Sequence, residues 1–261
     1  MKRLRTPILM YHHVEPRPFE PRPRFSGSYV SRAEFSDHLD WLADKSMSGR
    51  SLADALGRAD RGEAGSNEVV LTFDDGCKCF LEHVVPELER RGMSATVFVV
   101  SSQVGGENAW DLDRGERIEE LLSAEDLRDL AARGFEIGSH SRTHADLSQL
   151  DADALIGEVA GSKRDLEALL ERQVRTFCFP YGHFDTAATR AIRDAGYLGA
   201  VSVYGISGVS PSDRMALPRA VVRPGSSRLE FKLQATGWYG LWRRLPRLGI
   251  LSQLRSMRER S

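Results

Sequence analysis

The sequence predicts an α/β protein, a distorted TIM-like (β/α)7 barrel folded as a single domain with a C-terminal helical tail. Its 261 residues are enough for one large barrel domain, since such barrels often reach this size undivided. Short apolar runs rich in β-branched residues alternate with longer segments of helical periodicity, which is the pattern of parallel β/α units. Neither an internal repeat nor a clear linker interrupts the series, so we expect one domain.

Seven segments have the composition of buried strands. They are PILMYH (7–12), EVVLTF (68–73), ATVFVV (95–100), FEIGS (135–139), RTFCF (175–179), LGAVSV (198–203) and PRAVVR (218–223). Seven parallel strands, each with a following helix, indicate a closed or nearly closed barrel. An open doubly wound sheet is the alternative arrangement of the same units.

Start and stop signals of helices occupy the segments between these strands. Residues that cap helix N-termini stand at three of the starts: Ser31 with Glu34, Ser123 before AEDL, and Asp185 before TAATRAIRDAG. Glycines that favour helix ends follow at positions 92, 134 and 196. We therefore expect a helix in each of the sequence segments that separate two of these strands.

The chain is expected to divide into a barrel at residues 1–224 and a basic, amphipathic helical tail at residues 225–261, packed on the barrel. Net charge is +4 over residues 1–24 and +5 over residues 238–261, which leaves the middle at −10 within a total of −1. Such basic ends suit an acidic surface, a membrane face or an anionic lipid-linked glycan, although a solvated tail is the simpler explanation. The near-neutral total gives no reason to expect a nucleic acid partner, and it leaves the oligomeric state open.

Cysteine content and hydropathy predict a soluble, cytoplasmic protein whose contact with a membrane is at most peripheral. Three cysteines, an odd number, do not suggest a disulfide framework, so a reducing compartment is expected. The N-terminus is basic, but its apolar run is short and ends in two histidines, which is unlike an export signal. No apolar run reaches the ~18 residues that span a bilayer.

Polar side chains follow several of the predicted strands. Asp74 and Asp75 end the segment VVLTFDDG, and both can serve one site only if the chain leaves strand geometry there, which Gly76 permits. Alone, DDG is most often a turn. His140 and His144 follow a later strand at a spacing that brings two imidazoles close enough to share an ion.

Two histidines and one carboxylate form a zinc donor set whose open position holds a water with a pKa lowered toward ~7. A third polar group lies in the segment RTFCFPYG, in which Arg175 begins a strand and Pro180 and Tyr181 end it. The carboxyl ends of parallel strands gather at one face of a barrel. We therefore expect these groups to converge there with His12 and His13, which follow the first strand.

TFDDG, HSRTH and RTFCFPYG resemble the three first motifs of the polysaccharide deacetylase family, also described as NodB-homology or carbohydrate esterase family 4 enzymes. Their order and spacing match over residues 7–223. The resemblance implies that Asp75, His140 and His144 bind a divalent metal, usually Zn²⁺, with Co²⁺, Ni²⁺ or Mn²⁺ as alternatives.

Further roles follow from the same resemblance. Asp74 would be the general base, and Arg175 would pair with it and hold it ionised. The backbone N–H of Tyr181 would help to stabilise the oxyanion. The sugar-binding residues would be Pro180, Tyr181 and Trp110.

One departure from the family pattern concerns the general acid, because no histidine follows His183 where many members carry a late Leu-x-x-His motif. The last strand instead offers Arg219. LMYHHV resembles the opening of the exopolysaccharide-type branch, in which a histidine after the first strand takes this role. We expect His12 to protonate the leaving amine, with His183 as the competing candidate and a structural His12 as the alternative.

Cys77 and Cys79 also depart from the family pattern. Such a C-x-C pair can bind a soft metal, but two small residues at the start of a helix are the simpler explanation.

The predicted function is a metal-dependent carbohydrate N-deacetylase, a hydrolase that cleaves the linear C–N amide bond of N-acetylhexosamines. Its substrate would be a polysaccharide, as in exopolysaccharide biosynthesis, or a lipid-linked precursor. A metal-bound water would attack, with an Asp base and a His acid. The alternatives are a non-catalytic carbohydrate-binding relic of the fold and a metal-dependent hydrolase of another small amide.

Overall fold

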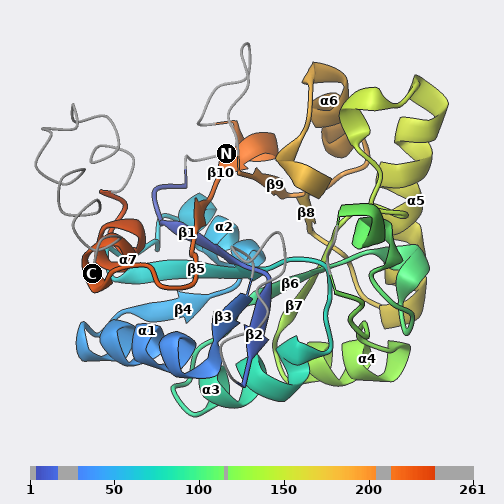
Figure 1. Ribbon diagram of the computed structural model, residues 1–261. Helices are drawn as coiled ribbons and strands as arrows, with labels where there is room; N and C mark the ends of the chain where they lie inside the picture. The colour runs from blue at the N-terminus through green and yellow to red at the C-terminus, as the bar shows by residue number, and fades with distance from the viewer. Residues whose placement is uncertain (1–3, 17–28, 115–116, 204–212, 239–261) are drawn as a thin grey trace, which may run out of the picture.

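The computed structural model describes residues 4–16, 29–114, 117–203 and 213–238 (Figure 1). Its centre is one parallel sheet in the order β10-β9-β8-β7-β6-β5-β1-β11, with β4 also paired to β5. The strands are β1 (Ile8–Tyr11), β4 (Ser48–Arg50), β5 (Glu68–Phe73), β6 (Thr96–Val99), β7 (Glu136–Ser139), β8 (Thr176–Cys178), β9 (Gly199–Ser202), β10 (Leu217–Pro218) and β11 (Ala220–Val221). All seven predicted strand segments are present. The sequence analysis missed the three-residue β4 and a separate parallel pair, β2 (His13–Glu15) with β3 (Tyr29–Ser31).

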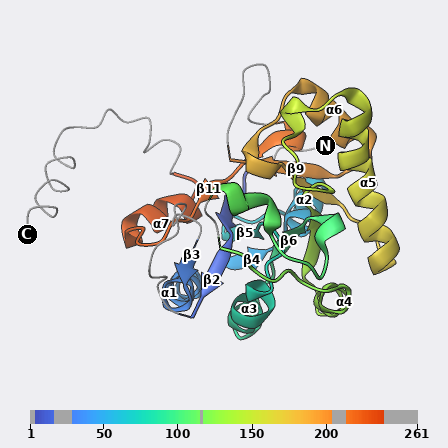
Figure 2. The same ribbon diagram turned by 45° about the vertical axis from the view of Figure 1, so that its right-hand side comes forward.

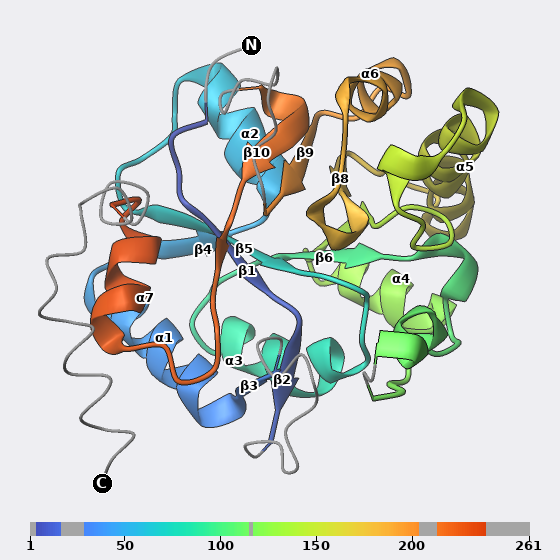
Figure 3. The same ribbon diagram turned by 45° about the horizontal axis from the view of Figure 1, so that its top comes forward.

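The two edges of the sheet belong to a single chain segment, which nearly closes the barrel. β10 pairs with β9 and β11 pairs with β1, and only Arg219 separates the two strands. The backbone N–H of Arg219 donates to the Ser202 carbonyl at 3.0 Å, and that of Val222 donates to the Met10 carbonyl at 3.0 Å. Figure 3 shows this last strand segment running beside β1. The predicted barrel is confirmed, and the open doubly wound sheet is excluded.

Helices surround the strands in the order expected of β/α units (Figure 2). They are α1 (Arg32–Asp44), α2 (Leu52–Arg61), α3 (Val85–Glu89), α4 (Ala124–Ala132), α5 (Ala152–Leu170), α6 (Thr186–Asp194) and α7 (Arg228–Ala235). The predicted caps are confirmed: Ser31 and Ser123 form capping boxes at α1 and α4, and Asp185 accepts a hydrogen bond from a backbone N–H of α6. Each cap satisfies a donor that the helix itself leaves unpaired.

Side chains and the start of α2 fill the amino end of the barrel. A partly buried network centres on Glu136, whose carboxylate accepts hydrogen bonds from the hydroxyls of Thr96 and Thr176 at 2.6 Å each. It also accepts the backbone N–H of Ala53 in α2 at 2.8 Å. At Gly138 a Cβ atom would lie 2.5 Å from the ring of Phe98, so only glycine fits beside that ring. Because this end is packed, the carboxyl ends of the strands are left to form a site.

α7 is the only described helix of the predicted C-terminal tail, and it packs beside α1 although the two are far apart in sequence (Figures 1 and 3). Phe231 of α7 stacks on the ring of His38 at 4.0 Å, and the Gln234 side-chain amide donates to the Val221 carbonyl at 2.9 Å. Residues 239–261 of the tail lie outside the described residues, so the tail as a whole stays a prediction. Among the described residues, no helix has the length and apolar character that a membrane crossing requires.

Candidate active site

The two adjacent carboxylates at the end of β5 face the same site because the backbone changes conformation between them. Thr72 and Asp74 point to the same side of the chain, as alternate residues of a strand do, because both bond the guanidinium of Arg219. Asp75 then takes a left-handed conformation with φ 72°, and Gly76 follows with φ 76°. The predicted departure from strand geometry is therefore present, and it begins at Asp75 itself. A positive φ at a residue other than glycine costs free energy, and such strain gathers at functional sites.

The three predicted metal ligands, Asp75, His140 and His144, come together in the structure, and we call them the Asp-His-His triad. Oδ1 of Asp75 lies 3.3 Å from Nε2 of His140 and 3.4 Å from Nε2 of His144. One donor atom from each residue lies within 4.8 Å of the others, and all three residues are buried. Burial raises the pKa of Asp75, but hydrogen bonds from both imidazoles and their charges hold it well below its ordinary value.

The tautomer of His140 is determined by a backbone partner. Its Nδ1 donates to the carbonyl of Cys178 at 2.9 Å, because a carbonyl oxygen can only accept. Nε2 faces Asp75 and donates to it, and an ion bound there would take the place of that proton. A ligating histidine is commonly oriented in this way by an acceptor on its other nitrogen. The residues therefore fit a divalent ion in donor type, spacing and tautomer.

A glutamate of α5 shapes the loop that carries both histidines. Oε2 of Glu158 accepts the backbone N–H groups of Arg142 at 2.8 Å and Thr143 at 2.9 Å, and Oε1 accepts the Thr143 hydroxyl at 2.7 Å. Within the loop, Ser141 and His144 have φ 65° and 64°. The sequence analysis missed Glu158, since a glutamate in the middle of a helix gives no local signal of this role.

Asp74 forms a buried, two-pronged ion pair with Arg219. NH1 of Arg219 donates to Oδ1 at 2.6 Å and NH2 donates to Oδ2 at 2.7 Å. The same guanidinium also donates to the hydroxyl of Thr72 at 3.1 Å and to the sulfur of Cys178 at 3.1 Å. Burial raises the pKa of Asp74, but the charge and hydrogen bonds of Arg219 lower it below its ordinary value. Asp74 is thus an ionised acceptor with a fixed orientation.

The predicted pairing of Arg175 with Asp74 is wrong. Arg175 is exposed and precedes β8, so it lies at the amino end of that strand, where its carbonyl accepts the backbone N–H of Leu198 at 2.7 Å. Asp74 follows β5 and lies at the carboxyl end of the barrel. Parallel strands place their starts and their ends at opposite rims, so the two side chains cannot meet. Arg219 reaches Asp74 because it lies between β10 and β11. We call this segment, which joins the two edges of the sheet, the seam.

The two candidate histidines for acid catalysis, His12 and His183, have different surroundings, and so does the neighbouring His13. Nε2 of His12 lies 3.9 Å from Oδ2 of Asp74, and its side chain is 22% exposed. Burial lowers the pKa of His12, and the charges of Asp74 and Asp75 partly oppose this. His13 is buried and stacks on Tyr29, so it does not share this position. His183 lies on the surface, where Nδ1 is 2.8 Å from Oδ2 of Asp146.

Comparisons with known proteins agree with the motifs. The sequence model of the polysaccharide deacetylase family matches residues 61–200, more than half of the chain. This chain belongs to the polysaccharide deacetylase family. Among curated relatives, YxkH of Bacillus subtilis, which carries the name of a polysaccharide deacetylase, is 27% identical over 233 residues, covering 88% of this chain and 76% of that protein.

A second relative is the poly-β-1,6-N-acetyl-D-glucosamine N-deacetylase of Staphylococcus aureus, 24% identical over 176 residues. This match covers 64% of the present chain and 58% of the staphylococcal enzyme. Two solved structures share the fold at 21% identity. Streptococcus pyogenes deacetylase PplD has a TM-score of 0.74 and matches over 90% of this chain and 99% of its own. IcaB from Ammonifex degensii has a TM-score of 0.70 and matches over 90% and 96%.

In this polysaccharide deacetylase family member, two aromatic rings border the Asp-His-His triad. Trp110 stacks on the ring of His144 at 4.7 Å, and Tyr181 meets the same ring edge-on at 4.6 Å. Both aromatic residues are half-buried, so part of each remains available to a ligand. Pro180 is buried, so of the predicted pair Pro180 and Tyr181 only Tyr181 offers much surface. Tyr181 has φ 57°, a fourth strained backbone position beside Asp75 and the two in the histidine loop, Ser141 and His144.

Proposed function

We propose that this protein is a metal-dependent N-deacetylase that hydrolyses the N-acetyl groups of an N-acetylhexosamine polysaccharide or of its lipid-linked precursor. The observation that carries the proposal is the position of an ionised, oriented carboxylate, Asp74, beside the Asp-His-His triad. The name of the staphylococcal relative, which specifies a poly-β-1,6-N-acetyl-D-glucosamine, supports this class of substrate.

Asp75, His140 and His144 would hold the ion, for which Zn²⁺ is the first expectation given two imidazoles and one carboxylate. When bound, the ion would lower the pKa of a water molecule and polarise the carbonyl of the acetamide. The protein contributes the fixed tautomer of His140, the loop held by Glu158 and the ring of Trp110 packed on His144. These contacts limit rotation of the ligands and favour one donor geometry.

Asp74 would accept the proton of the attacking water. An effective base must be ionised and aimed, and the two hydrogen bonds from Arg219 provide both conditions. The lowered pKa of Asp74 makes it a weak base in isolation, so it depends on water that is already acidified. Arg219 is a positioning residue in this scheme, since its guanidinium touches Asp74 rather than the substrate.

His12 would donate a proton to the leaving nitrogen. Its lowered pKa means that the ring starts neutral near pH 7, so it must first gain a proton. The 3.9 Å separation of Nε2 from Oδ2 of Asp74 gives a short path for the proton that Asp74 removes from water. His183 is a weaker candidate, because its Nδ1 is already bonded to Asp146 on the exposed side of the rim.

The backbone N–H of Tyr181 would donate to the oxyanion that forms on the acetyl carbonyl. Tyr181 lies against the His144 ring, which places this residue at the edge of the triad. The sugar would lie between the aromatic faces of Trp110 and Tyr181, since apolar ring faces suit the C–H face of a pyranose. The assembly of base, counter-ion and acid at one rim argues against a non-catalytic relic.

Acetate release from β-1,6- and β-1,4-linked N-acetylglucosamine oligosaccharides tests this function, with Asp74→Asn compared to wild type at equal metal content. Loss of the base should lower kcat by about 10²–10⁴-fold while the metal remains bound. Arg175→Ala is the matched control and should keep wild-type turnover. Full turnover by Asp74→Asn contradicts the mechanism, and sugar binding by the wild type without acetate release favours the relic.

A further inference from the structure

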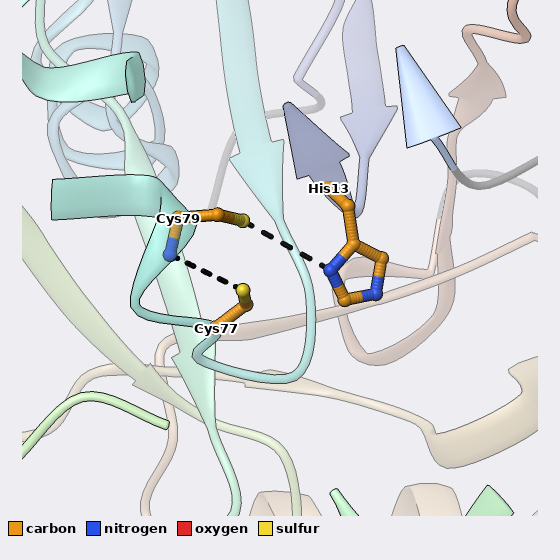
Figure 4. A group of neighbouring side chains, drawn as sticks. All are labelled: His13, Cys77 and Cys79. Carbon is orange, nitrogen blue, oxygen red and sulfur yellow. Dashed lines mark hydrogen bonds between the residues drawn. The ribbon is translucent and has the colours of Figure 1, made fainter. Parts of the chain in front are cut away.

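A second group of metal-binding side chains lies next to the proposed active site and takes no part in the mechanism above. It consists of His13, Cys77 and Cys79, which we call the thiolate cluster (Figure 4). All three side chains are buried, and one donor atom from each lies within 4.8 Å of the others. Figure 4 shows the His13 ring turning Nδ1 toward the two sulfur atoms while its other nitrogen points away.

The chain builds this cluster from the same segments that build the active site. His12 and His13 are consecutive, with ring centroids 6.4 Å apart, but they meet different partners: Nε2 of His12 lies near Asp74, whereas Nδ1 of His13 faces Cys79. The ring of His13 stacks on Tyr29 at 4.5 Å, with an angle of 12° between the ring planes, which holds its orientation. The cluster is therefore a defined arrangement rather than a set of loosely placed side chains.

Both cysteines lie in the turn that follows β5. Gly76 begins this turn with a left-handed backbone conformation, and Cys79 begins the helical segment that leads into α3. That segment opens with a π-helical turn, Phe80–Val84, a conformation that is rare and often marks a functional site. The expectation that Cys79 starts a helix is thus correct, but the turn also brings it to Cys77 and to His13, which is 66 residues away in sequence.

The distances fit coordination by one ion. Sγ of Cys79 lies 3.9 Å from Nδ1 of His13. Tetrahedral zinc, with bonds of about 2.3 Å to sulfur and 2.0–2.1 Å to nitrogen, places such a pair about 3.6 Å apart. The backbone N–H of Cys79 also donates to Sγ of Cys77 at 3.2 Å, a hydrogen bond that favours the thiolate form. A small rotation of side chains suffices to bring the donors to bonding distance.

We propose that His13, Cys77 and Cys79 form a second metal site, for a thiophilic divalent ion and foremost Zn²⁺. Thiolate and imidazole ligands select such ions over Mg²⁺ or Ca²⁺. Because all its donors are buried, this ion has a structural role: it ties the end of β1 to the turn after β5, and so holds His12 and Asp75 in place.

Cobalt substitution distinguishes this site from the active site, because only thiolate ligands give an intense near-ultraviolet charge-transfer absorption with Co²⁺. The full chain is stripped of metal with its thiols kept reduced by a phosphine and is then titrated with Co²⁺. We expect two ions per chain and a charge-transfer band that belongs to one of them. The double variant C77S/C79S should lose the band and bind one ion.

The matched variant H140A/H144A should bind one ion and keep the band, which separates this inference from the proposed function. Cys178, near Asp74 and His140, is the remaining thiol, and Cys178→Ser should keep the band as well. His13→Gln provides a second disruption of the cluster should C77S/C79S fail to fold, and it should weaken Co²⁺ binding at least tenfold. Zinc should raise the Tm of H140A/H144A but not of H140A/H144A/H13Q.

Three results would overturn the proposal. The first is a reduced wild type that binds cobalt without a charge-transfer band. The second is a band that persists in C77S/C79S and disappears in Cys178→Ser, which would assign the ion to the other thiol. The third is a mass lower by two hydrogens in protein purified from a reducing cytosol without added oxidant, because a Cys77–Cys79 disulfide cannot ligate the ion.

Discussion

The Asp-His-His triad and the thiolate cluster share one turn of the chain, the residues that follow β5, but they differ in donors and in access. Asp75 contributes an oxygen to the triad, beside the half-buried rings of Trp110 and Tyr181. Cys77, two residues later, contributes a sulfur to a cluster whose members are all buried. An ion that must exchange water needs an open position, whereas a structural ion needs a closed set of ligands. Under the two proposals, residues next to one another serve chemistry and stability separately.

The largest expected effect comes from exchanging the two neighbouring histidines, one of each site, for glutamine. His12→Gln should lower kcat/KM by about 10²–10⁴-fold because the proton donor to the leaving nitrogen is lost. It should keep both ions. His13→Gln should instead weaken Co²⁺ binding at the thiolate cluster and keep more of the turnover than His12→Gln does.

His183→Gln is the control for this pair and should keep nearly wild-type turnover, since His183 lies on the exposed side of the rim. A larger loss in His183→Gln than in His12→Gln would move the acid to the other histidine. Equal losses in His12→Gln and His13→Gln would remove the distinction between the two sites.

A smaller effect is expected from removing the counter-ion of Asp74. Arg219→Met leaves a buried carboxylate without its partner, which should lower the free energy of unfolding by about 3–5 kcal/mol. Arg175→Met, at the exposed position before β8, should change it by no more than about 0.5 kcal/mol. Urea unfolding of the metal-free proteins measures both.

The double variant D74N/R219M tests whether the cost comes from the unpaired charge. It should recover part of the stability that Arg219→Met loses, because the charge that needed compensation is gone. Additive losses in this double-mutant cycle would mean that Arg219 acts through packing alone.

The smallest effect concerns a buried imidazole that belongs to neither site. Burial lowers the pKa of His38 to about 4, so the native state binds fewer protons there than the unfolded chain does. This neutral histidine therefore contributes stability above pH 6.5, and the contribution is lost as the pH falls from 6.5 toward 4. The full span amounts to about 3 kcal/mol.

His38→Gln removes the titrating group and should flatten the pH dependence of unfolding in this window relative to the wild type. The stacking of His38 on Phe231 implies that α7 separates from α1 first as His38 is protonated. Fluorescence of Trp41, which meets Phe231 edge-on at 5.8 Å, reports this step. An unchanged pH dependence in His38→Gln would show that other groups govern it.

Much of the fold was predictable because its signals are local. β-branched runs, capping residues and glycines at helix ends mark β5, α1, α4 and α6 in the sequence itself. The three-residue β4, SGR, has no such signal and forms because it pairs with the start of β5. The parallel pair of β2 and β3 likewise forms only because two segments separated in the sequence come together.

The site residues were predictable where a sequence motif identifies them. The prediction failed where a contact depends on how distant strands meet. Asp75, His140 and His144 converge as expected, since they follow strands whose ends share a rim. The same rule excludes Arg175, which precedes its strand. Arg219 was not assigned to Asp74, because its pairing depends on how the last strand crosses the seam. The meeting of His13 with Cys77 depends in the same way on the pairing of β1 with β5.

The seam has a consequence for biosynthesis. Asp74 is translated long before Arg219, so a nascent chain contains the acidic residues and both histidines of the rim while their counter-charge is still missing. Insertion of the β10–β11 segment pairs it with both edges of the sheet and neutralises that carboxylate in one event. A chain truncated before this segment would carry an uncompensated anion in an incomplete barrel, so catalytic competence and resistance to proteolysis should arise together, at the last step of folding.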